Sequence, residues 1–273
     1  MSVIINYKEK NSKKNWSNLV LFVDENFNIS GLKKYILNKE YFFIFDLIKT
    51  RNPKEKIVTI NISSKRKIIL VSLKKSITRP GAEKLGAEFY NLFKEFNDGE
   101  FNFNSDTVSY KLKNFVGYFL HGLKLKSYSF DKYKTKKKRN KISITVTGKN
   151  KPSIEEQNKF KAIEEGTFYA RDLVSEPGNV LHPDEYAKRI NALKKIGLKI
   201  NVYDERKLKK LGMNTLLGVG QGSIRGSYLV TMEWNGLKDN SKPLAFVGKG
   251  VCFDTGGISL KPAKFMEDMT YDM

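Results

Sequence analysis

The chain of 273 residues is 40% hydrophobic and 12% aromatic, which is enough to build the cores of one large domain or two ordinary ones. A single cysteine, Cys252, excludes an internal disulfide framework and suits a reducing compartment. The polar N-terminus carries no secretory signal, and the most apolar run, YFFIFDLI, is too short for a membrane span and contains Asp46. We therefore expect a cytoplasmic globular protein without a membrane partner.

The net charge of +21 at pH 7 is concentrated in one half of the chain. Residues 1–150 hold 31 Lys and Arg against 13 Asp and Glu, a net of +18, whereas residues 151–273 hold 19 against 16, a net of +3. This difference supports two domains. Lysine far outnumbers arginine, so the excess has two open explanations: the codon bias of an AT-rich genome, or contact with a polyanion.

Strand-like and helix-like patterns alternate in the first half. Runs rich in β-branched residues predict strands at 18–23, 56–62, 67–73 and 141–148. An apolar stripe at helical spacing predicts a helix between the third and fourth of these strands; its members are Leu85, Phe89, Leu92, Phe93 and Phe96. YFLHGLKL repeats this pattern more briefly, and the charged tract at 132–141 is typical of a solvated loop. Alternating strands and helices indicate an α/β layer structure.

The pattern changes close to residue 150. Pro152 and Ser153, followed by Glu155 and Glu156, predict the start of a long helix suited to joining two domains. Two prolines and a glycine then mark a loop, and a second helix is expected to begin near Pro183. KINVYDE, SYLVTMEW and PLAFVG predict strands of a second α/β domain.

Several familiar site motifs fail when they are tested position by position. GVGQGSIRG has a serine at the third glycine position of a dinucleotide-binding loop, and the pair Gly248 and Lys249 lacks the other residues of a phosphate-binding loop. His121 and His182 are too few and too scattered for a histidine metal site, so we expect structural roles for both. Cys252 has no evident histidine partner and is expected to pack as a small side chain.

The segment FVGKGVCFDTGGISLKP, at 246–262, carries the residues best suited to chemistry. Lys249 follows an apolar run at a strand end, where active-site groups of α/β sheets gather, and Asp254, Lys261 and Asp272 come after it. Carboxylates and a neutral amine form a suitable ligand set for divalent metals, and a second lysine that stays protonated can polarise a carbonyl. From the residues alone, surface salt bridges between these lysines and aspartates remain open and are the commoner arrangement.

This segment, continued as MEDMTYDM, resembles the signature of the cytosol leucine aminopeptidase family of binuclear-metal aminopeptidases, including the spacing of Lys249, Asp254, Lys261 and Asp272. GYFLHGLKLKSYSFDKYKTKKK is similar to the end of the family's N-terminal domain. ARDLVSEPGNVLHPDEYA is similar to the linker and the start of the catalytic domain, and LGMNTLLGVGQGS to a segment shortly before the metal site. The first hundred residues match more loosely.

The resemblance implies a role for each matching residue. Asp254 would bridge two divalent ions, Mn²⁺ or Zn²⁺, and Lys249 and Asp272 would bind the tighter of them. Lys261 would stay cationic and stabilise the oxyanion formed on the peptide carbonyl, as a catalytic and substrate-binding group. The metals would bind the substrate's free α-amine and generate the attacking hydroxide, with bicarbonate as a further cofactor. Met269 matches a position lining the pocket for the first side chain, and a core methionine is the alternative.

The resemblance also implies an α/β fold in two domains. We expect a basic, macro-like N-terminal α/β domain over residues 1–150, a linker helix over 151–173, and the start of an α/β metallopeptidase catalytic domain with a mixed central sheet over 174–273. The implied protein is a cytoplasmic metalloprotease that releases N-terminal residues, leucine preferred, from peptides. The family's hexamer implies that it assembles as a homo-hexamer.

The sequence departs from the family in one large respect. The family's second motif, Asn-Thr-Asp-Ala-Glu-Gly-Arg, completes both metal sites, and nothing in this sequence resembles it. We therefore expect an N-terminal fragment that holds half of the site and is inactive and poorly stable as given. Two other functions stay open. One is nucleic-acid binding through the basic N-terminal domain, although no aromatic RNA-binding signature or helix-turn-helix is recognisable; the other is a folded, catalytically silent N-terminal half.

Overall fold

The computed structural model describes residues 2–8, 16–50, 52, 55–94, 99–108, 112–136, 141–237 and 241–272. The chain divides into two compact units, Met1–Phe168 and Tyr169–Met273, which we call the first and the second unit. Within the described ranges, no helix combines the length and the apolar character needed to cross a bilayer.

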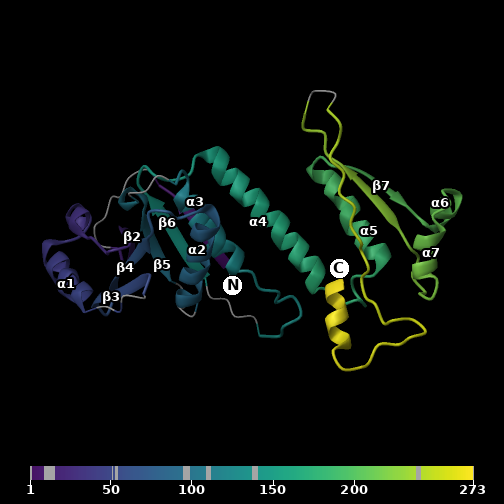
Figure 1. Ribbon diagram of the computed structural model, residues 1–273, viewed down its shortest axis with the longest axis horizontal. Helices are drawn as coiled ribbons and strands as arrows, with labels where there is room; N and C mark the ends of the chain where they lie inside the picture. Colours follow the sequence, from purple (N-terminus) through teal and green to yellow (C-terminus); the bar gives the residue numbers. More distant parts are fainter. Residues whose placement is uncertain are drawn as a thin grey trace. The chain divides into compact units, whose positions relative to one another are not determined.

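A six-stranded mixed sheet forms the first unit (Figure 1). Its order is β1-β6-β5-β2-β4-β3, and every pairing is parallel except that of β3 with β4. The strands are β1 (Ser2–Tyr7), β2 (Asn18–Asp24), β3 (Ile57–Ser63), β4 (Arg66–Leu73), β5 (Glu100–Asn104) and β6 (Lys141–Thr147). The four strands expected from β-branched runs are confirmed, whereas β1 and β5 were not predicted.

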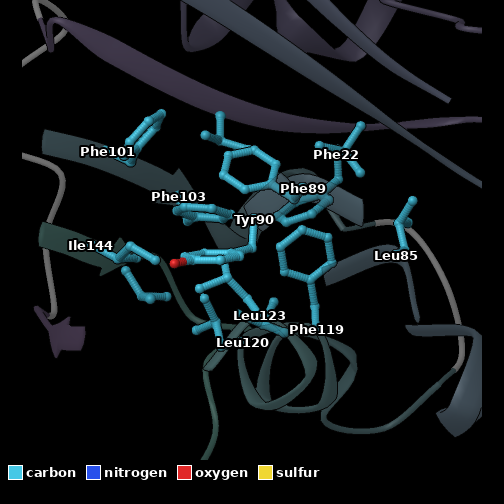
Figure 2. Close-up of a cluster of buried hydrophobic side chains, with 14 of the residues drawn as sticks. Phe22, Leu85, Phe89, Tyr90, Phe101, Phe103, Phe119, Leu120, Leu123 and Ile144 are labelled. Atoms are coloured by element: carbon cyan, nitrogen blue, oxygen red, sulfur yellow. The ribbon is translucent and has the colours of Figure 1, made fainter. Parts of the chain in front are cut away.

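Helices cover both faces of this sheet. On one face, α2 (Arg79–Phe93) and α3 (Phe115–Lys126) bury a cluster rich in phenylalanine, which Figure 2 shows around Phe89 and Phe119. On the other face, η1 (Ser30–Lys34) and α1 (Asn38–Lys49) pack on the alternate side chains of β2 and β4. The expected apolar stripe of α2 is buried except for Leu92, which is exposed; Phe96 lies outside the described residues.

The two helices of the phenylalanine-rich face approach each other closely at glycines. A Cβ atom added to Gly86 in α2 would lie 1.8 Å from the backbone oxygen of Phe119, and one added to Gly122 in α3 would lie 2.0 Å from that of Glu83. Only glycine permits this separation, because any side chain would push the two backbones apart. The glycines therefore set the separation of α2 and α3 in the layer over the sheet.

The long helix α4 (Ile154–Ser175) confirms the helix expected after residue 150. Ser153 caps it: its Oγ accepts from Glu156 N at 3.3 Å, and Glu156 Oε2 accepts from Ser153 N at 3.2 Å. Farther along, Glu164 pairs with His121 of α3 at 3.2 Å, and both side chains are nearly buried. His121 thus has the structural role expected from the sequence.

Helices and a two-stranded sheet make up the second unit, which is described for 169–237 and 241–272. Its elements are α5 (Pro183–Asn191), η3 (Ala192–Ile196), β7 (Lys199–Tyr203), α6 (Glu205–Lys210), α7 (Asn214–Gly220), β8 (Leu229–Glu233) and η4 (Met266–Asp272). β7 and β8 pair antiparallel, so the mixed sheet expected for this half is not formed by the described residues. The strand expected at 243–248 is also wrong: these residues are exposed and pair with no neighbouring strand in the described part. An apolar run becomes a strand only where an adjacent edge supplies hydrogen-bond partners.

Candidate functional site

A closed loop after Cys252 holds the candidate residue Asp254. Its Oδ1 accepts from Gly256 N at 2.8 Å, and Lys261 N donates to Thr255 O at 2.9 Å. Gly256 has φ +90°, and a Cβ added to it would lie 2.3 Å from Ser259 O. Glycine is therefore required at this position, and the turn that it allows brings Asp254 and Lys261 together.

Lys261 joins this loop to the C-terminal 3-10 helix. Its Nζ donates to Asp254 Oδ2 at 3.1 Å and to Met269 Sδ, on η4, at 3.0 Å. All three side chains are partly exposed. Three of the residues singled out in the sequence are thus neighbours, although they are up to 15 positions apart in the chain.

The carboxyl group of Asp254 is held in its ionised form. The hydrogen bond from Gly256 N, followed by those from Lys261 and by the positive charge of Lys249, places the pKa of Asp254 below its ordinary range. A carboxylate that stays ionised and partly open to solvent is suited to bind a cation. Here it binds the ammonium group of Lys261.

Lys249 and Asp272 do not complete a visible ligand cluster. Lys249 is exposed and influences Asp254 through its charge. Asp272 ends η4, but its side chain lies outside the described part of the chain. Among the described residues, no three His, Cys, Asp or Glu side chains are grouped closely enough to hold a metal ion. The donors that are described, one carboxylate and one amine, fit part of a divalent metal site in their chemistry.

The segment before the loop lies against the start of α5. A Cβ added to Gly250 would lie 3.0 Å from the ring of Tyr186, so this glycine allows the backbone to pass the ring. Burial first, and the negative charge of Asp184 second, raise the pKa of Cys252 to about 11. The thiol is therefore neutral at physiological pH, and Cys252 packs as a small side chain, as the sequence suggested.

His182 caps α5 and takes no part in this loop. Its Nδ1 accepts from Glu185 N at 3.4 Å and contacts Asp184 Oδ1. Asp184 also pairs with Arg225, 41 residues farther along, at 3.2 Å. This bridge was not found from the sequence, which predicted only that a helix begins near Pro183. No local signal marks such a distant pair.

The part of the chain that contains this loop matches known proteins. The model of the cytosol aminopeptidase family, catalytic domain, matches residues 168–273. The probable cytosol aminopeptidase of Chelativorans sp. (strain BNC1) is 52% identical over 161 residues, covering 56% of this chain and 32% of that protein. That of Bradyrhizobium sp. (strain BTAi1 / ATCC BAA-1182) is 50% identical over 157 residues, with the same coverage. The aligned part thus spans about a third of these relatives.

Solved structures with the same fold extend the likeness to nearly the whole chain. A tomato leucine aminopeptidase mutant matches with a TM-score of 0.78 at 20% identity, covering 98% of this chain and 57% of that one. The bottromycin maturation enzyme BotP, in complex with Mn, matches with a TM-score of 0.69 at 20% identity, covering 93% and 52%. At this identity the likeness shows the fold alone. It spans little more than half of either solved chain.

Proposed function

We propose, from the match of residues 168–273 to the catalytic-domain model of the cytosol aminopeptidase family, that this sequence contributes to a metal-dependent aminopeptidase. Its substrates are peptides, from which it releases N-terminal residues with a preference for leucine. The observation that carries the proposal is the family match over the segment in which Asp254, Lys261 and Met269 meet. Cytoplasmic location and assembly as a homo-hexamer belong to the same proposal.

The metal ligands proposed in this chain are Lys249, Asp254 and Asp272. These residues would hold two divalent ions, Mn²⁺ or Zn²⁺, which would activate water for attack and provide a binding point for the substrate's free α-amine. Asp254 would be shared by the two ions, because its side chain is partly exposed and its lowered pKa keeps it ionised; in this chain Oδ1 accepts from Gly256 N and Oδ2 from Lys261 Nζ. Lys249 can serve as a ligand only after losing its proton, which the charge of a nearby dication favours. Bicarbonate is proposed as a further cofactor.

Lys261 is proposed as the catalytic cation. A fixed positive charge aimed at the carbonyl oxygen stabilises the oxyanion that develops during attack on the peptide bond. In this chain its ammonium group donates to Asp254 Oδ2 and to Met269 Sδ, and it would have to leave Asp254 when that carboxylate binds metal. Met269 is proposed to line the pocket for the first side chain of the substrate.

The chain of 273 residues is proposed to be inactive alone. Its described part gathers one of the proposed carboxylate ligands, and that carboxylate binds Lys261. The purified chain, with Mn²⁺ or Zn²⁺ added, should therefore release no leucine from a leucyl peptide above the rate of a heat-treated sample. Metal-dependent release would contradict this part of the proposal.

Activity of the site itself can be tested in a chimaera. In it, residues 168–273 replace the matching segment of the Chelativorans relative, with which the chain is 52% identical over 161 residues. We expect metal-dependent release of leucine, and Lys261→Gln should lower kcat by about 100-fold, as removal of one oxyanion contact does. Lys264→Gln, at an exposed lysine outside the proposed machinery, is the matched control. A folded chimaera without activity would overturn the proposal.

A further inference from the structure

The first unit contains a hollow that no part of the proposed function uses. It has a volume of about 300 Å³, at the small end of the range for ligand pockets. Three of its lining residues, Lys113, Asn114 and Phe115, come from the start of α3, and three more, Lys149, Asn150 and Lys151, follow β6. We call this site the lysine hollow.

The position of the lysine hollow in the fold is one where ligands commonly bind. β5 and β6 are neighbouring parallel strands, and both loops that form the hollow follow their carboxyl ends. In sheets of this kind, ligands bind outside the carboxyl ends of the strands. A hydrogen bond joins the two loops: Lys149 N donates at 2.7 Å to Oδ1 of Asp106, which lies in the 3-10 turn η2 (Ser105–Thr107) after β5.

The backbone behind the hollow is built around one glycine. Gly148 has φ +103°, and a Cβ added to it would lie 2.6 Å from Ser105 Oγ. Any other residue would move the turn that carries Lys149 and Lys151. At the same strand ends, the buried atoms Asn104 Nδ2 and Ser105 Oγ have no hydrogen-bond partner within the described part of the chain. Such unpaired buried groups are uncommon in folded proteins, and neither residue is among those that line the hollow.

Positive charge dominates the lining. Lys113, Lys149 and Lys151 face one hollow, no carboxylate lines it, and none of these lysines forms an ion pair with the carboxylates that the structure describes. The two nearest acids have other partners: Asp106 accepts from Lys149 N, and Glu156 is bound by Asn114 Nδ2 and Ser153 N. Three like charges in one concavity repel one another, and an anion bound among them relieves that repulsion.

The start of α3 adds the positive end of a helix dipole beside the lysines. The N-cap residue Asn114 has φ 62°, and its side chain makes no capping hydrogen bond, because its amide group donates to Glu156. The first turn of this 12-residue helix therefore lacks the side-chain acceptor that usually satisfies its N–H groups. Phe115 N donates to Leu112 O at 3.1 Å, so this helix end favours an anion through the positive end of its dipole.

We propose that the lysine hollow binds a small phosphate-bearing molecule, up to the size of a nucleoside monophosphate. The phosphate oxygens contact the lysines beside the start of α3, and Val108 and Leu112 supply an apolar wall for the rest of the ligand. A phosphate group suits this site better than a single carboxylate, because it carries more charge and three strong acceptor oxygens. This inference concerns the first unit and is independent of the aminopeptidase proposal.

Calorimetric titration of the 273-residue chain with inorganic phosphate, with adenosine monophosphate and with adenosine tests the proposal at low salt. We expect both phosphate-bearing probes to bind and adenosine to show no detectable heat. The double substitution Lys149→Gln with Lys151→Gln should weaken binding of the monophosphate by about tenfold or more, as loss of two charge-assisted contacts does. Lys113→Gln, from the other wall, should weaken it as well.

The matched control is the double substitution Lys74→Gln with Lys75→Gln. These two lysines are exposed after β4, outside the hollow, and their loss changes the net charge by the same amount. The control should alter the affinity by less than about twofold, the change expected from net charge alone. Equal weakening by both doubles would overturn the proposal. It would also be overturned if single-stranded DNA bound with a steep salt dependence while the mononucleotide did not, because that result indicates a diffuse polyanion surface.

Discussion

The two units differ in how completely they bury their apolar residues. The sheet of the first unit is covered on both faces, by α2 and α3 on one side and by α1 and η1 on the other. In the described part of the second unit, six hydrophobic residues are buried: Leu173, Leu181, Ala187, Ile190, Ile200 and Leu208. Several large apolar residues are exposed there; they include Ile224, Trp234, Phe246, Val247 and Ile258. The residues proposed for catalysis thus lie on the unit with the smaller core.

The contrast indicates that the first unit supplies most of the stability, whereas the second holds the residues proposed for catalysis. A unit closed on both faces can fold through its own contacts, whereas a two-stranded sheet with one partly covered face is marginal by itself. Extended apolar surface on a folded chain is typical of interaction sites and of ligand-binding grooves. Stability measurements on this chain should therefore report mainly on the first unit.

Hydrogen exchange should give the largest difference between the units. Amides of β2 are paired on both sides by β4 and β5, whereas those at 243–250 are exposed and outside regular structure. We expect β2 to exchange more slowly by a factor of about 10³ or more, because exchange there requires global unfolding of the unit. Exchange followed by mass spectrometry measures both segments in one sample. Equal protection would mean that another copy of the chain covers the second unit.

A substitution in the phenylalanine-rich cluster should destabilise the first unit strongly. Phe89 is buried, and its ring centre lies 5.8 Å from that of Phe119 and 5.7 Å from that of Phe101. Phe89→Ala should lower the free energy of unfolding by about 3–5 kcal/mol, through lost burial and the cavity left behind. Leu92→Ala, three positions farther along the same helix and 56% exposed, should lower it by less than about 1 kcal/mol.

The chain offers one tryptophan in each unit as a reporter. Trp16 packs against the cluster under α1, and Trp234 belongs to the second unit. Urea unfolding followed by Trp16 fluorescence in a Trp234→Phe background therefore measures the first unit alone. A similar loss of stability for Phe89→Ala and Leu92→Ala would show that α2 does not pack as the structure describes.

The buried ion pair of the first unit should make its stability depend on pH. Arg66 Nε donates to Glu40 Oε1 at 2.6 Å, and Leu37 N donates to Glu40 Oε2 at 3.0 Å. Burial raises the pKa of Glu40, but these hydrogen bonds and the charge of Arg66 outweigh it, so the net pKa lies below the ordinary value. The contribution is therefore present above the ordinary pKa of a glutamic acid, about 4.3, and is lost as the pH falls through the lowered pKa.

Glu40→Gln tests the sign of this effect. At pH 7 it should cost about 3 kcal/mol, because Arg66 is left buried without its counter-charge, and the cost should shrink below pH 4. Glu88→Gln removes a solvent-exposed pair with Lys56 and should cost less than about 1 kcal/mol at either pH. Urea midpoints at pH 7, 5 and 3 provide the comparison. A cost for Glu40→Gln that grows on acidification would contradict the assigned pKa direction.

Local sequence patterns predicted the strands that are rich in β-branched residues. β2 and β4 are runs of β-branched and apolar residues, and both were found; β5, with the sequence EFNFN, has buried asparagines in place of β-branched residues and was missed. At the site, the sequence alone showed the spacing of Lys249, Asp254 and Lys261. The contact of Lys261 with Met269 was not, because it depends on the path that the chain takes after the positive φ of Gly256.

The smallest expected effect on stability concerns Lys261, which is proposed to matter most for chemistry. Unlike the buried pair of Glu40 with Arg66, its pair with Asp254 is partly solvated on both sides. Such pairs contribute little, so Lys261→Gln should change the free energy of unfolding by less than about 0.5 kcal/mol, the same as Lys264→Gln. Hydrogen exchange of the amides of α5 and β7 measures this in the second unit. A loss above about 1.5 kcal/mol would mean that Asp254 and Met269 hold a structural cation, and the proposed catalytic role would then need another residue.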